Sequence, residues 1–521
     1  MKTAAASIAA GGFLATPEAG VAATPPAGAR NVFPVTEFGA QADGKNIDSP
    51  AINKAIAAAA EAGGGMVVFP AGSYLCYSIH LRSKVALVFT PGTVLVAADS
   101  SAGGSYDAAE PNEPWEAYQD FGHNHWQNSL IWGEDLENIS ILGPGLIWGK
   151  GLSSGRDREL PKAETPGVGN KSVSLKNCRN VLLRDFSILH GGHFAVLATG
   201  VDNLTIDHLT IDTNRDGIDI DCCRNVRVTN CSINSPWDDA IVPKSSFALG
   251  YARPTEMVTI SDCLVTGNFA EGTLLDGTCK PFPADTDVPR IGRIKLGTES
   301  NGGFKNITIA NCVFDGCHGL ALETEDGAVL EDVAVTNITM RHIFGSPIFL
   351  RLGSRMRGPA GVPVGKLHRV LISNVVCSHA TAAVSSIISG IPGHVVTDVK
   401  LQNIVIQHEG GGTPEMAALQ PPENEAKYPD PEMFGTMPAQ GFFIRHVKDL
   451  EMRDVEIMAH KPDARPAFAL HDVNGADFYH VKAPPAAGAP MFTLDEVTDF
   501  IVTRSRPVPD TYLEKADRKK L

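Results

Sequence analysis

Three aspartates between residues 214 and 244 have the type and spacing needed for hydrolysis by paired carboxyl groups. Asp216 precedes the adjacent pair Asp238 and Asp239 by about one structural repeat, and apolar residues alternate with polar ones between them. In a stacked β-coil, residues one repeat apart become neighbours on adjacent strands, roughly 4.8 Å apart. We therefore predict one small patch of three carboxyl groups, able to protonate a leaving oxygen and to activate water.

The strands that must position these aspartates are indicated by a motif that recurs from about residue 130. An Asn or Asp is followed by an apolar residue at Asn138-Ile139, Asn180-Val181, Asn203-Leu204, Asn225-Val226, Asn306-Ile307, Asp332-Val333, Asp398-Val399, Asp449-Leu450 and Asp499-Phe500. The shortest intervals are roughly 22 to 26 residues, and period-two alternation within them is typical of a β-solenoid. We predict an all-β fold, a right-handed parallel β-helix of about ten or more coils, with the handedness following the rule for parallel crossovers.

Residues 33–98 are expected to form an N-terminal cap and the first coils. The segment 35–38 is predicted to be a short strand, and the Ala-rich segment 51–62 is predicted to be a short helix. Asp48 precedes this helix and is a candidate N-cap. A helix at this end would cover the hydrophobic cross-section that the first coil of a solenoid exposes.

Residues 99–505 are predicted to form the β-helix domain, and residues 506–521 a polar, solvated C-terminal tail. An irregular insertion near 409–440 is rich in Gly and Pro. An insertion of this length either lines a cleft or is disordered. Residues 1–23 combine a short basic start, an Ala-rich stretch and small residues, which is typical of a secretory signal peptide, with a disordered leader as the alternative. We therefore expect a secreted or periplasmic protein.

Composition restricts the partners. The formal net charge of −15 argues against nucleic acid, although a local basic pocket would still allow an acidic sugar. No segment is apolar enough to predict a membrane span, and we expect a monomer.

The chain has 10 cysteines, and Cys178, Cys231, Cys263 and Cys312 occupy equivalent repeat positions. We expect these to be buried thiols that act as small hydrophobic residues, with disulfides as the alternative.

The segment Asn214 to Lys244 resembles glycoside hydrolase family 28, the polygalacturonase and rhamnogalacturonan hydrolase family. The resemblance extends over nearly the whole chain from Phe33 and includes the segments VTEFGAQADG and LENISILGPG. In that family, an Asn-Thr-Asp motif precedes a Gly-Asp-Asp or Gln-Asp-Asp motif by about one coil. The corresponding segments here are Asn214-Arg215-Asp216 and Trp237-Asp238-Asp239. The resemblance implies an inverting hydrolase that needs no metal and no other cofactor.

The resemblance also implies a role for each aspartate. Asp238 would be the general acid, and Asp216 and Asp239 would orient and deprotonate water. An inverting glycosidase keeps its two carboxyl groups roughly 6.5–9.5 Å apart. Crowding three carboxyl groups should raise the pKa of at least one of them. The alternative is that the three are turn and stacking residues, as Asp219 and Asp221 are expected to be.

The chain departs from the family pattern on the next two coils. It has Ile291-Gly292-Arg293 where the family has Gly-His-Gly, and Ala321-Leu322-Glu323 where the family has Arg-Ile-Lys. Overlaying the repeats places His318 over Gly292 and Lys295 under Ala321. We hypothesise that His318 replaces the missing histidine from one coil later. Lys295, with Arg293, would replace the missing cations of Arg-Ile-Lys from one coil earlier, and each shift would be one strand spacing. The alternative for His318 is a turn residue.

Further residues are candidates for substrate binding. Glu323 would repel a uronate carboxylate and would favour a neutral neighbour such as rhamnose. Trp237 would either stack on a sugar face or anchor a loop. Lys244 matches the family segment that follows the acid pair and would tune the acids. Arg351 and Arg445, from later coils, are expected to be exposed strand residues.

The predicted function is hydrolysis of a pectic polysaccharide or oligosaccharide at a rhamnogalacturonan- or galacturonide-type bond. The long insertion favours exo action. Three alternatives stay open: a polysaccharide lyase on the same fold, a glycosidase for a non-pectic rhamnose-containing glycan, and a non-catalytic carbohydrate-binding β-helix. A lyase would use a calcium-binding carboxylate cluster and a base. The missing histidine favours the binding protein, and the three aspartates argue against it.

Overall fold

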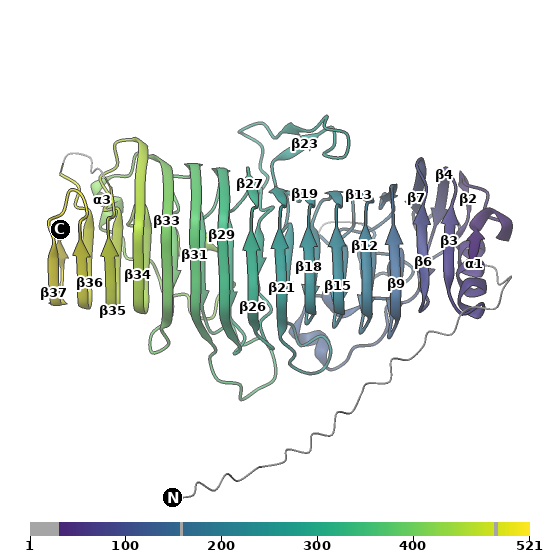
Figure 1. Cartoon of the computed structure of the whole chain (residues 1–521), viewed down its shortest axis with the longest axis horizontal. Helices are drawn as coiled ribbons and strands as arrows, with labels where there is room; N and C mark the ends of the chain where they lie inside the picture. Colours follow the sequence, from purple (N-terminus) through teal and green to yellow (C-terminus); the bar gives the residue numbers. More distant parts are fainter. Residues whose placement is uncertain (1–30, 157–159, 484–487) are drawn as a thin grey trace, which may run out of the picture.

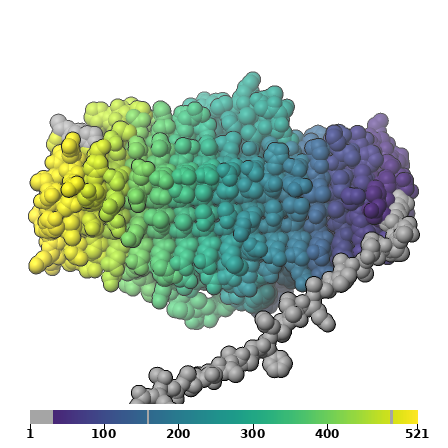
Figure 2. Space-filling model, in the orientation of Figure 1, coloured from purple at the N-terminus to yellow at the C-terminus, as the bar shows by residue number. Residues whose placement is uncertain are grey.

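The computed structural model describes residues 31–156, 160–483 and 488–521, so the signal peptide predicted at 1–23 lies outside the described residues. Strands stack in parallel at intervals of one coil, and the colours of Figures 1 and 2 therefore follow the sequence along the long axis. This arrangement confirms the predicted parallel β-helix. No helix among the described residues is long and apolar enough to cross a membrane.

The coils form three sheets. The first carries the candidate site and contains β5 (Ile79–His80), β8 (Ile131–Glu134), β11 (Lys171–Lys176), β14 (Phe194–Thr199), β17 (Asp216–Asp221), β20 (Ile241–Lys244), β25 (Ile294–Leu296), β28 (Leu320–Thr324), β30 (Ile348–Leu352) and β32 (Ser386–Ser389). The second contains β1 (Val32–Pro34), β3 (Gly65–Phe69), β6 (Val85–Phe89), β9 (Glu137–Leu142), β12 (Arg179–Arg184), β15 (Asp202–Asp207), β18 (Arg224–Thr229), β21 (Thr255–Ser261) and β26 (Phe304–Ala310). The third contains β2 (Asp43–Ile47), β4 (Gly72–Cys76), β7 (Thr93–Ala97), β10 (Gly145–Trp148), β13 (Ser187–Leu189), β16 (Thr210–Asp212), β19 (Ser232–Asn234), β22 (Leu264–Thr266) and β27 (Val313–Asp315).

Longer strands continue these sheets toward the C-terminus: β29 (Val329–Ile343), β31 (Lys366–Ala380), β33 (Val396–Gly410), β34 (Phe442–Lys461), β35 (Phe468–Tyr479) and β36 (Phe492–Thr503). A small antiparallel pair, β23 (Phe269–Glu271) and β24 (Lys280–Pro281), projects from the body of the helix (Figure 1).

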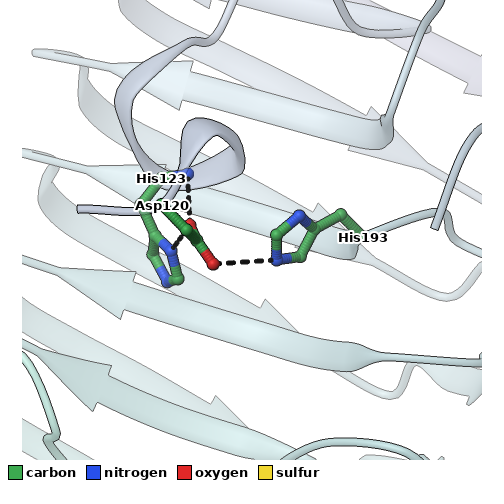
Figure 3. Close-up of side chains that lie close together, drawn as sticks. All are labelled: Asp120, His123 and His193. Atoms are coloured by element: carbon green, nitrogen blue, oxygen red, sulfur yellow. Dashed lines mark hydrogen bonds and ion pairs between the residues drawn. The ribbon is translucent and has the colours of Figure 1, made fainter. Parts of the chain in front are cut away.

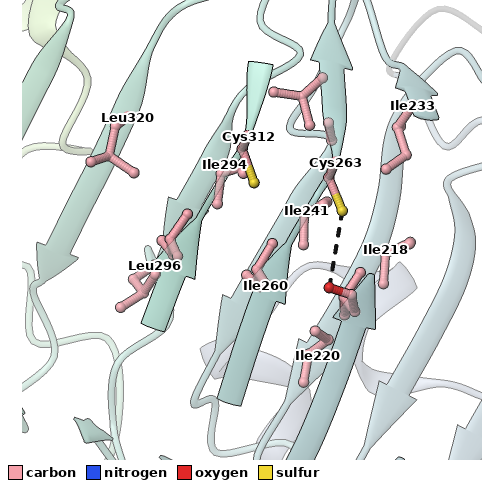
Figure 4. Close-up of a cluster of buried hydrophobic side chains, with 14 of the residues drawn as sticks. Ile218, Ile220, Ile233, Ile241, Ile260, Cys263, Ile294, Leu296, Cys312 and Leu320 are labelled. Carbon is pink, nitrogen blue, oxygen red and sulfur yellow. Dashed lines mark hydrogen bonds between the residues drawn. The ribbon is translucent and has the colours of Figure 1, made fainter. Parts of the chain in front are cut away.

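The core is a set of aliphatic columns that run through the coils. Ile218 pairs in register with Ile241, Ile241 with Ile294, and Ile294 with Leu320, and all four side chains are almost fully buried (Figure 4). Burial of each such side chain stabilises the fold by about 1.5–3 kcal/mol. All ten cysteines are free, and nine are buried, which confirms the expectation of thiols that pack as small hydrophobic residues.

The recurring Asn motif forms a ladder of amides on the surface. Asn180, Asn203 and Asn225 each donate from Nδ2 to Oδ1 of the asparagine one coil earlier, at 3.0, 2.9 and 2.7 Å. Each of these asparagines has a φ between 55° and 57°, the left-handed region that Asn tolerates better than most residues. The motif therefore marks a turn that asparagine stabilises in two ways, by its backbone conformation and by its side-chain amide.

In the N-terminal cap, the predicted helix is confirmed and the predicted first strand is wrong. Helix α1 (Ser49–Glu61) covers the first coil, as predicted. The segment Val35–Phe38, predicted to be a strand, is the 3₁₀ helix η1, because β1 ends at Pro34, which has no N–H to extend a ladder. Asp48 lies at the N-cap, but its carboxylate accepts from the backbone N–H groups of residues 41 and 42 rather than from the helix.

The C-terminal tail was predicted to be polar and solvated; most of its residues are exposed, but they form two ordered strands. β37 (Thr511–Ala516) and β38 (Lys519–Lys520) turn back and pair antiparallel with β36. The last parallel coil would otherwise expose a row of unpaired N–H and C=O groups, which is a site for edge-to-edge association. The chain end therefore closes the C-terminal edge of the solenoid.

The insertion after β33 is ordered and contains α3 (Pro414–Ala417) and η3 (Pro431–Phe434). Arg351 and Arg445, expected to be exposed, are buried and hold its backbone. Arg351 Nη2 donates to the carbonyl oxygen of Glu423 at 3.1 Å, and Arg445 Nη1 donates to that of Pro421 at 2.8 Å. Because both arginines belong to the sheet that carries the aspartates, they fix the insertion over that sheet.

The asparagine ladder has a gap at Met257, which gives a stability prediction. Register places Met257 between Asn225 and Asn306, and it has a φ of 57° and an exposed side chain. Met257→Asn should restore two amide contacts and suit the left-handed backbone, and should raise the free energy of unfolding by about 1 kcal/mol. The exposed Met66→Asn, in a regular strand, is the matched control. Thermal unfolding of both variants checks this, and a lower Tm for Met257→Asn would contradict it.

Candidate active site

The three aspartates meet at the N-terminal ends of two neighbouring strands of the first sheet, β17 and β20. Asp216 begins β17, and Asp238 and Asp239 lie in the turn before β20. Gly217 N–H donates to the Asp239 carbonyl oxygen at 3.0 Å, so the turn stacks directly on β17. One carboxylate oxygen of each aspartate lies within 4.8 Å of the others. The spacing in the sequence thus correctly indicated a shared patch.

This spacing bears on the expected mechanism. The limit of 4.8 Å applies to one oxygen of each group, whereas the roughly 6.5–9.5 Å of inverting glycosidases separates whole carboxyl groups, so the inverting mechanism implied by the resemblance stays a prediction. The cluster brings the groups close enough for direct electrostatic coupling. Which of them is charged is therefore decided by their other neighbours.

Asp238 is paired with a cation. Arg215 Nε and Nη2 donate to Asp238 Oδ2 at 3.2 and 3.0 Å. Arg215 Nη1 also donates to the carbonyl oxygens of Ser154 and Gly155, at 3.4 and 3.3 Å. The guanidinium is thus fixed from two sides, and it holds Asp238 in a charge-assisted hydrogen-bonded pair.

Asp239 is paired with two cations from the next coil. Arg293 Nε donates to Asp239 Oδ1 at 2.7 Å, and Lys295 Nζ lies 3.1 Å from Asp239 Oδ2. Burial alone would raise the pKa of Asp239, but Lys295 and Arg293 together lower this pKa to about 2. Asp239 is therefore a carboxylate at any ordinary working pH.

Asp216 lacks such a partner. In the part of the chain that the structure describes, no arginine or lysine lies within ion-pairing distance of its carboxyl group, and its nearest basic neighbour is His193, with Nε2 4.0 Å from Oδ2. Burial, Asp238 and Asp219 raise the pKa of Asp216 well above its ordinary value. Burial and Arg215 hold the pKa of His193 well below its ordinary value, so this imidazole is neutral. Asp216 is the member of the cluster most disposed to carry a proton.

One wall of the site is built by the coil and loop that precede the aspartates. Asp120 precedes the short helix α2 (Phe121–Asn124) and lies between two imidazoles (Figure 3). Its carboxylate contacts His123 Nδ1 and lies 3.6 Å from His193 Nε2. α2 can approach this closely because a Cβ at Gly122 would collide with the His193 ring.

Lys244 lies beneath this wall rather than in the cleft. It is buried, and its Nζ is 3.0 Å from Asp219 and 3.6 Å from Glu299. Its Nζ also contacts His123 Nε2. The predicted role in tuning the acids is compatible with this position, but contact with a substrate is not.

The opposite wall comes from the insertion. Lys295 Nζ donates to the Tyr428 hydroxyl at 2.9 Å, and Arg293 Nη2 lies 3.6 Å from Asp430 Oδ2. Tyr428 is 54% exposed, so its ring is available to a ligand. Of the two alternatives for the insertion, disorder is wrong, because the segment is ordered and contacts the cations beside Asp239.

Two predicted substrate contacts are corrected by burial. Glu323 is fully buried, accepts a hydrogen bond from Thr298 Oγ1 at 3.2 Å, and lies 3.9 Å from Lys295. Burial raises the pKa of Glu323 to about 7, with Lys295 opposing, so Glu323 neither touches nor repels a uronate at acidic pH. His318 is also buried, and its Nε2 hydrogen-bonds the Pro289 carbonyl oxygen at 2.8 Å, as expected of a turn residue.

The structure confirms the overlay of the two coils, while the exchange of residues between them stays a hypothesis. The overlay is correct, because Ile294 pairs with Leu320 and Lys295 with Ala321. Both cations of the earlier coil, Arg293 and Lys295, were predicted to bind substrate, but they are buried and touch Asp239 instead. Trp237 is partly exposed, and the Arg156 guanidinium lies 3.7 Å from its ring centroid, so one face of the indole is already covered.

Sequence reasoning missed Arg215, Asp120 and His193. Arg215 stands where the family has Thr, immediately before Asp216, and this change of residue type was a readable signal. Phe194 is in register with Asp216, so His193 lies next to Arg215 on the preceding coil. Asp120 reaches the site from an irregular segment, which no repeat period could have located.

Two family models match the chain. One, described as "Rhamnogalacturonase A/epimerase, pectate lyase-like", matches residues 30–142, and the other, "Right handed beta helix region", matches residues 157–287. The second match confirms the predicted handedness.

The chain is 24% identical over 329 residues to a "Probable polygalacturonase" from Vitis vinifera, covering 59% of this chain and 60% of that protein. It is 23% identical over 274 residues to an "Exo-poly-alpha-D-galacturonosidase" from Dickeya chrysanthemi, covering 43% of each. The chain therefore spans three fifths or less of the curated relatives it matches. The family 28 exopolygalacturonase of Yersinia enterocolitica has a similar fold, with a TM-score of 0.62, 17% identity, and coverage of 86% of this chain and 78% of that chain. The chain is therefore a right-handed parallel β-helix protein that is similar in sequence to polygalacturonases and in fold to a family 28 exopolygalacturonase.

Proposed function

We propose that the protein is a glycoside hydrolase that removes galacturonide units from the ends of pectic chains. The observation that carries the proposal is the charge state of the cluster. Three carboxyl groups lie within 4.8 Å, two of them paired with cations and one without. Hydrolysis of a glycosidic bond needs this combination of a protonated acid and an ionised carboxylate.

In the proposed reaction, Asp216 gives its proton to the glycosidic oxygen as the bond to the anomeric carbon breaks. A water held by Asp238 and Asp239 attacks that carbon and passes its proton to a carboxylate. This assignment differs from that implied by the resemblance, in which Asp238 is the acid. Exposure favours Asp238, whose side chain is 23% exposed against 3% for Asp216. Charge pairing favours Asp216, because Arg215 is bound to Asp238 and no such cation is bound to Asp216 among the described residues.

Exo action is supported by the walls of the site. Asp120 and the carbonyl groups of Ser154 and Gly155 flank the aspartates on one side, and Tyr428 and Asp430 flank them on the other. A cleft bounded within one coil on each side holds a chain end better than a continuous chain. The printed names of the Dickeya and Yersinia relatives also refer to exo enzymes.

The choice of sugar rests on the relatives, because the argument for a neutral neighbour from Glu323 is withdrawn. A galacturonide agrees with the printed names of the two curated relatives, and a rhamnogalacturonan bond agrees with the description of the first family model. The N-terminal residue pattern supports action outside the cytoplasm, by a secreted or periplasmic protein.

A calcium-dependent lyase is the second candidate, since the three aspartates are grouped closely enough to hold an ion. Arg215, Arg293 and Lys295 already balance the negative charge of the cluster. These three cations would repel a divalent cation bound between the aspartates. We therefore favour hydrolysis. A non-catalytic binding role has no need of an unpaired, buried carboxyl group beside two paired ones.

A substrate panel tests the function. With homogalacturonan oligomers, rhamnogalacturonan oligomers and rhamnose-capped neutral glycans, we expect monosaccharide release from galacturonide chain ends and no effect of chelator. Sizing the products and reading the new reducing ends measures this. An unsaturated product absorbing in the ultraviolet would instead identify a lyase, and release of mixed oligomers would identify endo cleavage.

Variants of the aspartates test the roles. Because an activated leaving group needs no proton, Asp216→Asn should lose about 10²–10⁴-fold in kcat/KM on oligosaccharides but much less on a dinitrophenyl glycoside. Asp238→Asn should lose activity on both substrates alike. Asp185→Asn, at an exposed pair with His208, is the control. Selective rescue of Asp238→Asn would restore the assignment implied by the resemblance.

The pH profile tests the pairing of Asp239. Lys295 stabilises the ionised carboxylate, so Lys295→Met should raise the pKa of Asp239 from about 2 and move the acidic limb of kcat/KM upward by about one pH unit or more. Lys400→Met, which breaks an exposed pair with Glu451, is the control. An unmoved acidic limb in Lys295→Met would show that Asp239 does not govern it.

A further inference from the structure

A second group of chemically active side chains lies outside the candidate active site, on the long C-terminal strands. His379 is on β31, Glu409 on β33 and His460 on β34. His408 pairs with Ala459 and Gly410 with Lys461, so Glu409 is directly opposite His460. The three residues therefore come from three consecutive strands of the solenoid.

His379 is brought to this position by a β-bulge. Cys377 pairs with Ile406 and Ala380 with His408, so two residues of β31 oppose one of β33. His379 has a φ of 56° at the bulge. A bulge redirects a side chain relative to the regular alternation of the strand.

The two imidazoles converge over the middle strand. β31 and β34 are two strand spacings apart, roughly 9.6 Å, yet the ring centroids of His379 and His460 are 4.7 Å apart. One donor atom from each histidine and from Glu409 lies within 4.8 Å of the others. The third histidine of this row, His342, has its ring centroid 5.0 Å from that of His379.

The donor atoms of these three side chains, His379, Glu409 and His460, have no hydrogen-bond or ion-pair partner among the described residues. Two other surface histidines in the same left-handed conformation are paired with an aspartate: His208 with Asp185 at 2.8 Å and His480 with Asp454 at 2.6 Å. At His379, register places His342 where that aspartate would be.

We propose that His379, Glu409 and His460 bind a divalent transition-metal ion, of the class of Zn²⁺ or Ni²⁺, that links three coils. Two imidazoles and one carboxylate suit such ions, whereas Mg²⁺ and Ca²⁺ prefer oxygen ligands. Zinc lies about 2.0–2.2 Å from nitrogen and oxygen ligands, so tetrahedral donors stand about 3.4 Å apart. Donor separations of up to 4.8 Å must therefore shorten by up to about 1.4 Å, which these partly or fully exposed side chains achieve by rotation. Water completes the coordination.

The ion would serve the solenoid rather than the proposed hydrolysis. The coil of β31 is three strand spacings beyond that of β20, counting through β25, β28 and β30, roughly 14 Å along the axis. The other mixed group, Asp120 with His123 and His193, is a weaker metal candidate. Lys244 Nζ contacts His123 Nε2 there, and Arg215 adds positive charge close to Asp120.

The test uses the full chain without a polyhistidine tag, freed of metal by chelator and dialysis. We expect ZnCl₂ to bind with one site by calorimetry and to raise Tm, and MgCl₂ to do neither. His460→Ala and Glu409→Gln should each weaken zinc binding by at least about tenfold and abolish the rise in Tm. His480→Ala, an exposed histidine in the same turn conformation, should behave as the unmodified protein.

Both variants should have the metal-free Tm of the unmodified chain, which separates loss of a ligand from loss of folding. Zinc binding that is equally tight in His460→Ala and the unmodified protein would overturn the proposal, because the ion would then bind elsewhere. Failure of the unmodified chain to bind zinc would overturn it as well. Neither result depends on the pectic substrate or on catalysis.

Discussion

Parallel stacking in register is the constraint on which the rest of this structure depends. Each coil places its residues directly above those of the coil before, about one strand spacing away. The same rule stacks Ile218, Ile241 and Ile294 in the core, aligns the asparagine amides on the surface, and brings Asp239 above the start of β17. A residue in such a fold gains or loses partners according to what stands one repeat away.

This rule explains how the candidate site manages its charge. A group of aspartates in a solenoid would repel one another from coil to coil, and here cations on the same or the next coil compensate. Arg215 precedes Asp216 and pairs with Asp238, while Arg293 and Lys295 on the next coil pair with Asp239. Only Asp216 is left without a cation, and burial then favours its neutral form. The difference in charge among three identical side chains thus comes from their neighbours.

The insertion shows how an irregular segment is made part of a regular scaffold. Buried arginines in the sheet donate to its backbone carbonyl groups, and its own Tyr428 and Asp430 reach the cations beside Asp239. Buried guanidinium groups are costly unless they are hydrogen-bonded, and the insertion supplies the acceptors. The loop and the charged residues beneath it therefore stabilise one another beside the three aspartates.

The sequence by itself determined the repeat, the β-helix, the capping helix and the grouping of Asp216, Asp238 and Asp239, because a fixed period converts sequence spacing into spatial neighbours. It did not determine which residues are accessible, so Glu323 and His318 were expected in the cleft and are buried, and Arg351 and Arg445 were expected at the surface and are not. Asp120 and Tyr428 lie in segments without a repeat period, so their contacts could not be located from the sequence. The antiparallel strand β37 covers the open edge of the last coil, and no local sequence pattern predicts this pairing. Burial and charge pairing depend on every chain segment around a group at once, and only the tertiary structure brings those segments together.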